Sequence, residues 1–150
     1  MLEIERLETG YGRKQVLFGM NIKIQKNEIV ALIGPNGAGK STVLKAVCGL
    51  IPLWKGEIRF NGEVISASTP DRNIGKGIVF APQGNRVFPT LSVRENLEMG
   101  GCHLSKSELL NRIEQIFQSF PLLKERNRQE AGKLSLFCFG KFPEQIFLLL

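Results

Sequence analysis

A glycine-rich segment, flanked by an apolar run and a helical pattern, is the feature that most constrains this chain. The segment reads Gly34-Pro35-Asn36-Gly37-Ala38-Gly39-Lys40-Ser41. The apolar run 29–33 before it predicts a strand buried on both faces, and residues 41–50 after it predict an amphipathic helix. A strand, a glycine-rich turn and a helix in this order are the structural context of a phosphate-binding loop. The segment therefore predicts a site for the phosphates of a nucleotide.

The residue types in this loop suit a nucleoside triphosphate. Glycines allow successive backbone N–H groups to turn toward anionic oxygens, and the following helix adds the positive end of its dipole. The ammonium group of Lys40 can contact the terminal phosphates, and the hydroxyl of Ser41 can ligate a bridging Mg²⁺. The motif alone also admits an unrelated P-loop enzyme, such as a small-molecule kinase or a GTPase, although the sequence contains no Asn-Lys-x-Asp for guanine. We therefore expect ATP and Mg²⁺ as ligands.

Composition and charge limit which classes of protein and partner remain possible. The 150 residues fit one domain, and their net charge of +6 is scattered without a run of five like charges, so nucleic acid is not indicated as a partner. The three cysteines stand far apart, which argues against disulfides and a zinc site and suits a reducing cytoplasm. The apolar C-terminal stretch is too short, and too interrupted by Lys141, Pro143 and Glu144, to span a bilayer.

Hydrophobic patterning predicts further strands and helices around the loop. Alternating residues at 2–7 and 16–24 predict half-buried strands, and Asn61-Gly62 predicts a hairpin turn between strands 57–60 and 64–65. A short apolar run at 77–80 predicts another strand, after a polar loop. Apolar side chains between 109 and 120 fall on one helical face, and Ser105 with Glu108 predicts a capping box at the start of that helix.

The residues around the loop carry a family resemblance. Residues 34–42 resemble the phosphate loop of the ATP-binding subunits of ABC transporters. The resemblance implies ATP contacts from Gly34, Pro35, Asn36, Gly37, Ala38, Gly39, Lys40, Ser41 and Thr42. Tyr11, within Thr9-Gly10-Tyr11-Gly12, lies where the family stacks an aromatic ring on adenine; a half-buried aromatic at a strand end is the alternative. Gln83, after Ala81-Pro82, resembles the family's catalytic glutamine, which contacts Mg²⁺ and water beside the terminal phosphate.

The stretch after Gln83 continues the resemblance. Residues 92–100 are similar to the first helix of the family's helical subdomain. Phe88, Pro89 and Leu91 lie where the family docks its membrane permease, with subdomain core as the alternative. The segments 87–100 and 120–126 most resemble the subgroup that energises branched-chain amino acid uptake. The resemblance implies a permease partner, a homo- or heterodimer with another ATP-binding subunit, and a cytoplasmic location, peripheral on the inner face of the cell membrane.

The implied fold is an α/β P-loop NTPase core of the ABC type with an antiparallel β layer and a partial helical subdomain, C-terminally truncated. The resemblance covers 1–135, the expected nucleotide-binding domain, and 136–150 form an atypical hydrophobic tail without clear periodicity. Leu136 and Phe137 stand where the family's signature has glycines, and no Asp-Glu pair follows an apolar run. The sole aspartate is Asp71. We expect the strand before the phosphate loop to lack a neighbour and to expose an edge.

These features leave two functions open. The resemblance implies the ATP-binding subunit of an ABC importer, which couples ATP binding and hydrolysis to transmembrane uptake of branched-chain amino acids. The altered signature and the missing Asp-Glu pair favour the alternative, a truncated, non-catalytic remnant that binds ATP without turnover. We expect residues 136–150 to result from a reading-frame slip or a premature end in the gene for a full-length subunit.

Overall fold

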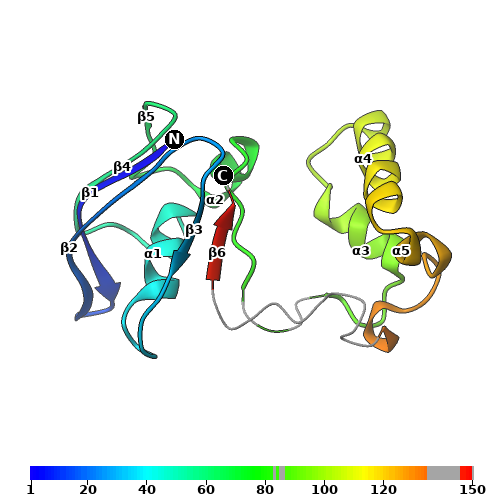
Figure 1. Ribbon diagram of the computed structural model, residues 1–150, viewed down its shortest axis with the longest axis horizontal. Coiled ribbons are helices and arrows are strands. Elements are labelled where there is room, and N and C mark those ends of the chain that lie inside the picture. The colour runs from blue at the N-terminus through cyan, green and yellow to red at the C-terminus, as the bar shows by residue number, and fades with distance from the viewer. Residues whose placement is uncertain (83, 85–86, 135–145, 150) are drawn as a thin grey trace. The chain divides into compact units, whose positions relative to one another are not determined.

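Four antiparallel strands form the larger sheet of the structure, a computed structural model that describes residues 1–82, 84, 87–134 and 146–149 (Figure 1). Their order in the sheet is β2-β1-β4-β5, with β1 at Leu2–Tyr11, β2 at Lys14–Ile24, β4 at Lys55–Phe60 and β5 at Glu63–Val64. Asn61 and Gly62 have positive φ angles of 50° and 84°, as the two central residues of a type I′ turn require. The predicted antiparallel layer and hairpin turn are confirmed.

The described residues belong to two compact units. Unit 1 contains residues 1–81 and 146–149, and unit 2 contains the described residues between 82 and 134. The core of unit 1 lies between the sheet and helix α1 (Lys40–Val47), where Leu7, Val47 and Ile58 are fully buried. Within the described residues, every helix falls short of the length and apolarity needed to cross a bilayer.

Strand β3 (Ile29–Leu32) leads directly into the glycine-rich loop. Its residues Val30 and Leu32 pack against the core of unit 1, but Ile29 is 66% exposed and Ile33, just after the strand, is 82% exposed. The prediction of burial on both faces is therefore wrong. A strand is buried on both faces only where other elements pack on each face, and here the core lies on one face of β3.

Strand β6 (Ile146–Leu149) pairs antiparallel with β3, from Ile29 opposite Leu149 to Leu32 opposite Ile146. One edge of β3 is thus hydrogen-bonded, which corrects the expectation that this strand lacks a neighbour. Backbone groups at a strand edge need partners, and a short apolar run of β-forming residues supplies them.

Helix α1 follows the glycine loop as predicted, but it begins at Lys40, one residue before the predicted start, and it ends at Val47 rather than at Leu50. Gly49 explains the early end: its φ is +73°, and its backbone N–H donates to Ala46 in a left-handed helix terminus. Helix α2 (Pro70–Gly75) occupies the stretch expected to be a polar loop. Residues 77–80, predicted to be a strand, contain no strand in the structure, because an apolar run forms one only beside a hydrogen-bonding neighbour.

Unit 2 is helical, with α3 at Val93–Gly100, α4 at Lys106–Ser119, α5 at Pro121–Glu125 and a 3₁₀ turn at Ala131–Lys133. The predicted capping box of α4 is present, since the backbone N–H of Glu108 donates to Ser105 Oγ and the Glu108 carboxylate accepts from the backbone N–H of Ser105. Helix α3 begins with an equivalent box between Ser92 and Glu95. The predicted helices of this subdomain are confirmed.

Candidate nucleotide-binding site

The glycine-rich loop connects β3 to α1 and contains a tight turn. The backbone N–H of Ala38 donates to the carbonyl of Pro35 at 3.2 Å, and Gly37, the third residue of that turn, has a φ of +86°. A turn with positive φ at its third residue favours glycine strongly. The loop thus reverses direction over Pro35–Ala38 before α1 begins.

Gly39 joins the loop to α1 and lies against strand β2. Its φ is +90°, and a Cβ atom added there would lie 2.7 Å from Cδ2 of Leu17 and 3.3 Å from Cγ1 of Val16. Leu17 is itself buried in the core of unit 1. Only glycine fits both the backbone conformation and the space, so the sheet determines where the loop ends.

The side chain of Lys40 folds back over the loop. Its ammonium group donates to the carbonyl of Gly34 at 2.7 Å and to the carbonyl of Pro35 at 2.9 Å. An ammonium group has three donors, so one remains for an anion beside the loop. The ammonium group of Lys40 therefore lies against the first carbonyls of the loop and keeps one donor available.

The N-terminus of α1 offers a second set of donors. No side chain of the described residues caps it, and its first turn holds no acidic residue. The first N–H groups of a helix lack intrahelical acceptors and carry the positive end of the dipole, so they suit phosphate oxygens. The side chain of Ser41 in this turn is exposed, whereas Thr42 is buried. This donor set fits an anionic ligand such as a triphosphate.

Tyr11 is brought to the same helix although it is 31 residues away in sequence from Thr42. Its hydroxyl lies 3.4 Å from Oγ1 of Thr42, and the ammonium group of Lys45 lies 5.5 Å from the centroid of its ring. The residue remains 44% exposed. An aromatic ring thus stands beside the helix whose N-terminus faces the loop.

The glycines on either side of Tyr11 shape the hairpin that presents it. A Cβ atom on Gly10 would lie 2.0 Å from the carbonyl oxygen of Lys14, and Gly12 has a φ of +59° in the turn between β1 and β2. The buried Thr9 anchors the strand end, because its hydroxyl donates to the carbonyl of Pro52 at 2.6 Å. The hairpin end is therefore fixed on both sides of the ring.

Further contacts were predicted for Gln83 and Phe88, which follow residues 1–81 of unit 1 in the sequence. Gln83 lies outside the described residues, so its expected contacts with Mg²⁺ and water stay predictions. Among the residues that the structure describes, no group of three His, Cys, Asp or Glu side chains could hold a metal ion. Phe88, expected to face a permease, is exposed in unit 2, where its backbone N–H donates to Asn96 Oδ1.

Sequence reasoning missed two residues that contact α1 or lie on it. Lys45 lies three residues after Thr42 on α1, a spacing that places both on one helical face and could have drawn attention to it. Asn73, in the middle of α2, is fully buried and donates through Nδ2 to the carbonyl of Val47 at the end of α1. No local pattern indicates that contact, because Asn73 and Val47 are 26 residues apart.

The fold and the loop together define an ATP-binding cassette. Residues 17–136 match the family model described as ABC transporter, so the chain belongs to the ABC transporter family. The predicted P-loop fold is confirmed by the structural likeness to a nucleotide-free ATP-binding cassette from an ABC transporter. That structure has 27% identity and a TM-score of 0.74 over 89% of this chain and 58% of the other.

Two curated relatives narrow the resemblance within the family. The chain is 41% identical over 135 residues to the high-affinity branched-chain amino acid transport ATP-binding protein BraG of Pseudomonas aeruginosa. It is 38% identical to the probable branched-chain amino acid transport ATP-binding protein LivF of Archaeoglobus fulgidus. Each match covers 90% of this chain and 58% or 57% of the relative, so the chain spans less than two thirds of their length. The predicted similarity to the branched-chain subgroup is confirmed.

Proposed function

We propose that this chain forms the ATP-binding part of an ABC importer subunit that couples ATP binding and hydrolysis to transmembrane uptake of branched-chain amino acids. The observation that carries the proposal is the loop geometry, in which Lys40 is held over a glycine turn at the uncapped N-terminus of α1. The curated relatives support the importer class, because both are ATP-binding proteins of branched-chain amino acid transport.

The proposal assigns a role to each part of the site. The loop amides and Lys40 bind the phosphates, and the ring of Tyr11 stacks on adenine. The hydroxyl of Ser41 is available for Mg²⁺, which the family resemblance pairs with Gln83. Bound Mg²⁺ would neutralise charge on the terminal phosphates. The exposed hydroxyl of Ser41, one residue after Lys40 in the first turn of α1, supports this assignment.

We further propose a membrane permease and a second ATP-binding subunit as partners, at the inner face of the cell membrane. The support is the family membership together with the exposed Phe88 in the helical unit. The subgroup similarity supports a permease for branched-chain amino acids.

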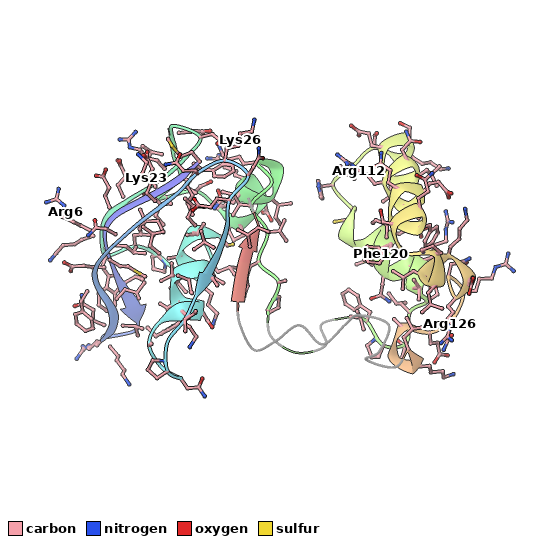
Figure 2. All side chains as sticks on the ribbon, in the orientation of Figure 1. Arg6, Lys23, Lys26, Arg112, Phe120 and Arg126 are labelled. Atoms are coloured by element: carbon pink, nitrogen blue, oxygen red, sulfur yellow. The ribbon has the colours of Figure 1, made fainter. Side chains whose placement is uncertain are left out.

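Labelled-ATP binding tests the proposal directly. Lys40→Ala should weaken binding by about 30-fold or more, because removing one partner of a close charge pair costs about 2–5 kcal/mol and each 1.4 kcal/mol is tenfold. Lys26→Ala is the matched control: Lys26 extends into solvent from the turn between β2 and β3, at the opposite end of β3 from the loop (Figure 2). Equal affinities for the Lys40→Ala and Lys26→Ala variants would contradict the proposed site.

Measuring phosphate release in the same assay distinguishes an ATP-hydrolysing importer subunit from a remnant that only binds ATP. These 150 residues contain no Asp-Glu pair after an apolar run, so we expect them to bind ATP without turnover, whereas a subunit that carries such a pair should hydrolyse it. Positioned general bases contribute about 10²–10⁴-fold to such rates. Phosphate release by these 150 residues well above the uncatalysed rate would contradict this expectation.

A further inference from the structure

We propose that Lys45 and Thr42 are positioning residues that hold the ring of Tyr11 ready for an adenine base before any nucleotide binds. The inference rests on the proposed function and deepens it, because it concerns how the base half of the site is built. Both residues lie on α1, the helix that also carries Lys40 and Ser41. One helix would therefore position the groups for the phosphates and the ring for the base.

Two contacts of different kinds define the position of the ring. Lys45 Nζ lies over the face of Tyr11, 5.5 Å from the centroid, within the range of a cation–π interaction. Thr42 Oγ1 lies 3.4 Å from the Tyr11 hydroxyl, a weak hydrogen bond at the far end of the ring. A contact on the face and a contact at the tip together restrict both torsions of the side chain.

In this proposal, the base stacks on the ring face that Lys45 does not cover. Lys45 covers one side, and Tyr11 is still 44% exposed. A base stacked on the opposite face would meet a ring whose rotamer is already chosen. Immobilising a side chain on binding costs about 0.5–1.5 kcal/mol, so a ring held in advance favours binding. A cation on the far face also suits an aromatic stack, since it draws electron density from the ring.

The two lysines of α1 have separate roles in this account. Lys40 donates to the carbonyls of Gly34 and Pro35, whereas Lys45 forms no ion pair with a carboxylate in the described part of the chain. The ring of Tyr11 is the partner that the structure gives to Lys45. A competing explanation is a general attraction of Lys45 for phosphate, and the experiment must distinguish the two.

Comparing two ligands makes that distinction. In calorimetric titrations, Lys45→Met should weaken ATP binding about 3- to 10-fold, in line with cation–π contacts, and change tripolyphosphate binding less than about 2-fold. Lys45→Arg should restore ATP affinity, because a guanidinium group also stacks on aromatic rings. An equal loss for both ligands would assign Lys45 to the phosphates. If the Lys45→Met variant bound ATP as tightly as the wild type while the Lys40→Ala variant did not bind it, the inference would be overturned and the proposed function would stand.

A nucleotide-free measurement keeps the inference testable even if ATP does not bind. Tyr11 is the only tyrosine, so 3-fluorotyrosine labelling gives a ¹⁹F signal from that ring alone. Lys45→Met and Thr42→Val should each shift and narrow the signal as the ring gains freedom, and Thr42→Ser should retain the wild-type signal. Lys14→Met is the matched control, because Lys14 pairs with Tyr11 through the backbone and is exposed. Identical spectra for the Lys45→Met and Lys14→Met variants would overturn the inference.

Discussion

Contacts between residues far apart in the sequence organise one unit of this chain, and contacts between close neighbours organise the other. In unit 1, β1 pairs with residues as distant as Phe60, opposite Leu2, and the site combines Tyr11 with Thr42. In unit 2, the two main helices each begin with a box of residues three apart. The candidate nucleotide site therefore depends on contacts between residues far apart in the sequence, whereas the helical unit depends more on signals between close neighbours.

The largest expected effect is in the core that supports the site. Leu7→Ala should lower the free energy of unfolding by about 2–5 kcal/mol, because a fully buried leucine is replaced by a cavity. Leu110→Ala on α4 is the control from the other unit, since Leu110 is 46% exposed and alanine is a good helix former. Urea unfolding of both variants measures the difference. A Leu110→Ala cost as large as that of Leu7→Ala would break the comparison.

Glycine-to-alanine substitutions should change the free energy of unfolding in opposite directions in the two units. Gly39→Ala should destabilise unit 1 by about 1–3 kcal/mol and weaken ATP binding, because it combines a positive φ with a contact on Leu17. Gly100→Ala in α3 should stabilise by about 0.5–1 kcal/mol, since its Cβ would meet nothing within 4 Å and its φ is not positive. Thermal unfolding with matched circular dichroism spectra checks both signs.

Gly37→Ala separates the two causes at the loop. Gly37 shares the positive φ of Gly39, but an added Cβ would meet no atom within 4 Å. Its cost should therefore be that of backbone strain alone, and smaller than that of Gly39→Ala. If the two variants were equally unstable, the contact with Leu17 would not determine where the loop ends.

The features predicted from the sequence are those with local causes. The glycine loop, the start of α1, the Asn61-Gly62 turn and the box at Ser105 each depend on a few neighbouring residues. Their physical origin lies in φ preferences and in unpaired helix ends, which a short segment reveals. The strand alternation in β1 and β2 was predictable for the same reason.

The features missed from the sequence depend on distant neighbours. An apolar run at 77–80 has the composition of a strand, but the structure gives it no strand. The burial of β3 was overestimated because an apolar run does not reveal which of its faces is covered. The contact of Lys45 with Tyr11 likewise requires the fold, since no spacing rule relates a hairpin end to a helix 34 residues later.

A buried amide should contribute more to stability than an exposed one that makes the same kind of bond. Asn73 donates to the carbonyl of Val47 at the end of α1, inside the core, whereas the half-buried Asn127 makes an exposed hydrogen bond to the carbonyl of Lys124 at the end of α5. Asn73→Ala should cost about 1–3 kcal/mol, because it leaves a buried carbonyl unpaired. Asn127→Ala should cost less than about 0.5 kcal/mol, since water replaces the amide. Equal costs in urea unfolding would contradict the assigned difference in burial.

The smallest effect concerns pH and the local order of unit 2. The side-chain hydrogen bond from Ser92, followed by the bond from its backbone, lowers the pKa of Glu95 below its ordinary value of 4.5, and Ser105 lowers the pKa of Glu108 in the same way. A carboxylate whose pKa is lower in the folded state stabilises fully above the unfolded value and loses that contribution as pH falls through the folded value. Below about pH 4.5, the backbone amide hydrogens of α3 and α4 in the wild type should therefore exchange with solvent faster than at neutral pH, after correction for intrinsic exchange rates. The Glu95→Gln, Glu108→Gln double variant should show less of this acceleration, and Glu125→Gln should follow the wild type. An acid response of the same size in the double variant would show that the boxes do not control these helices, and the contrast between the two units would then rest on packing alone.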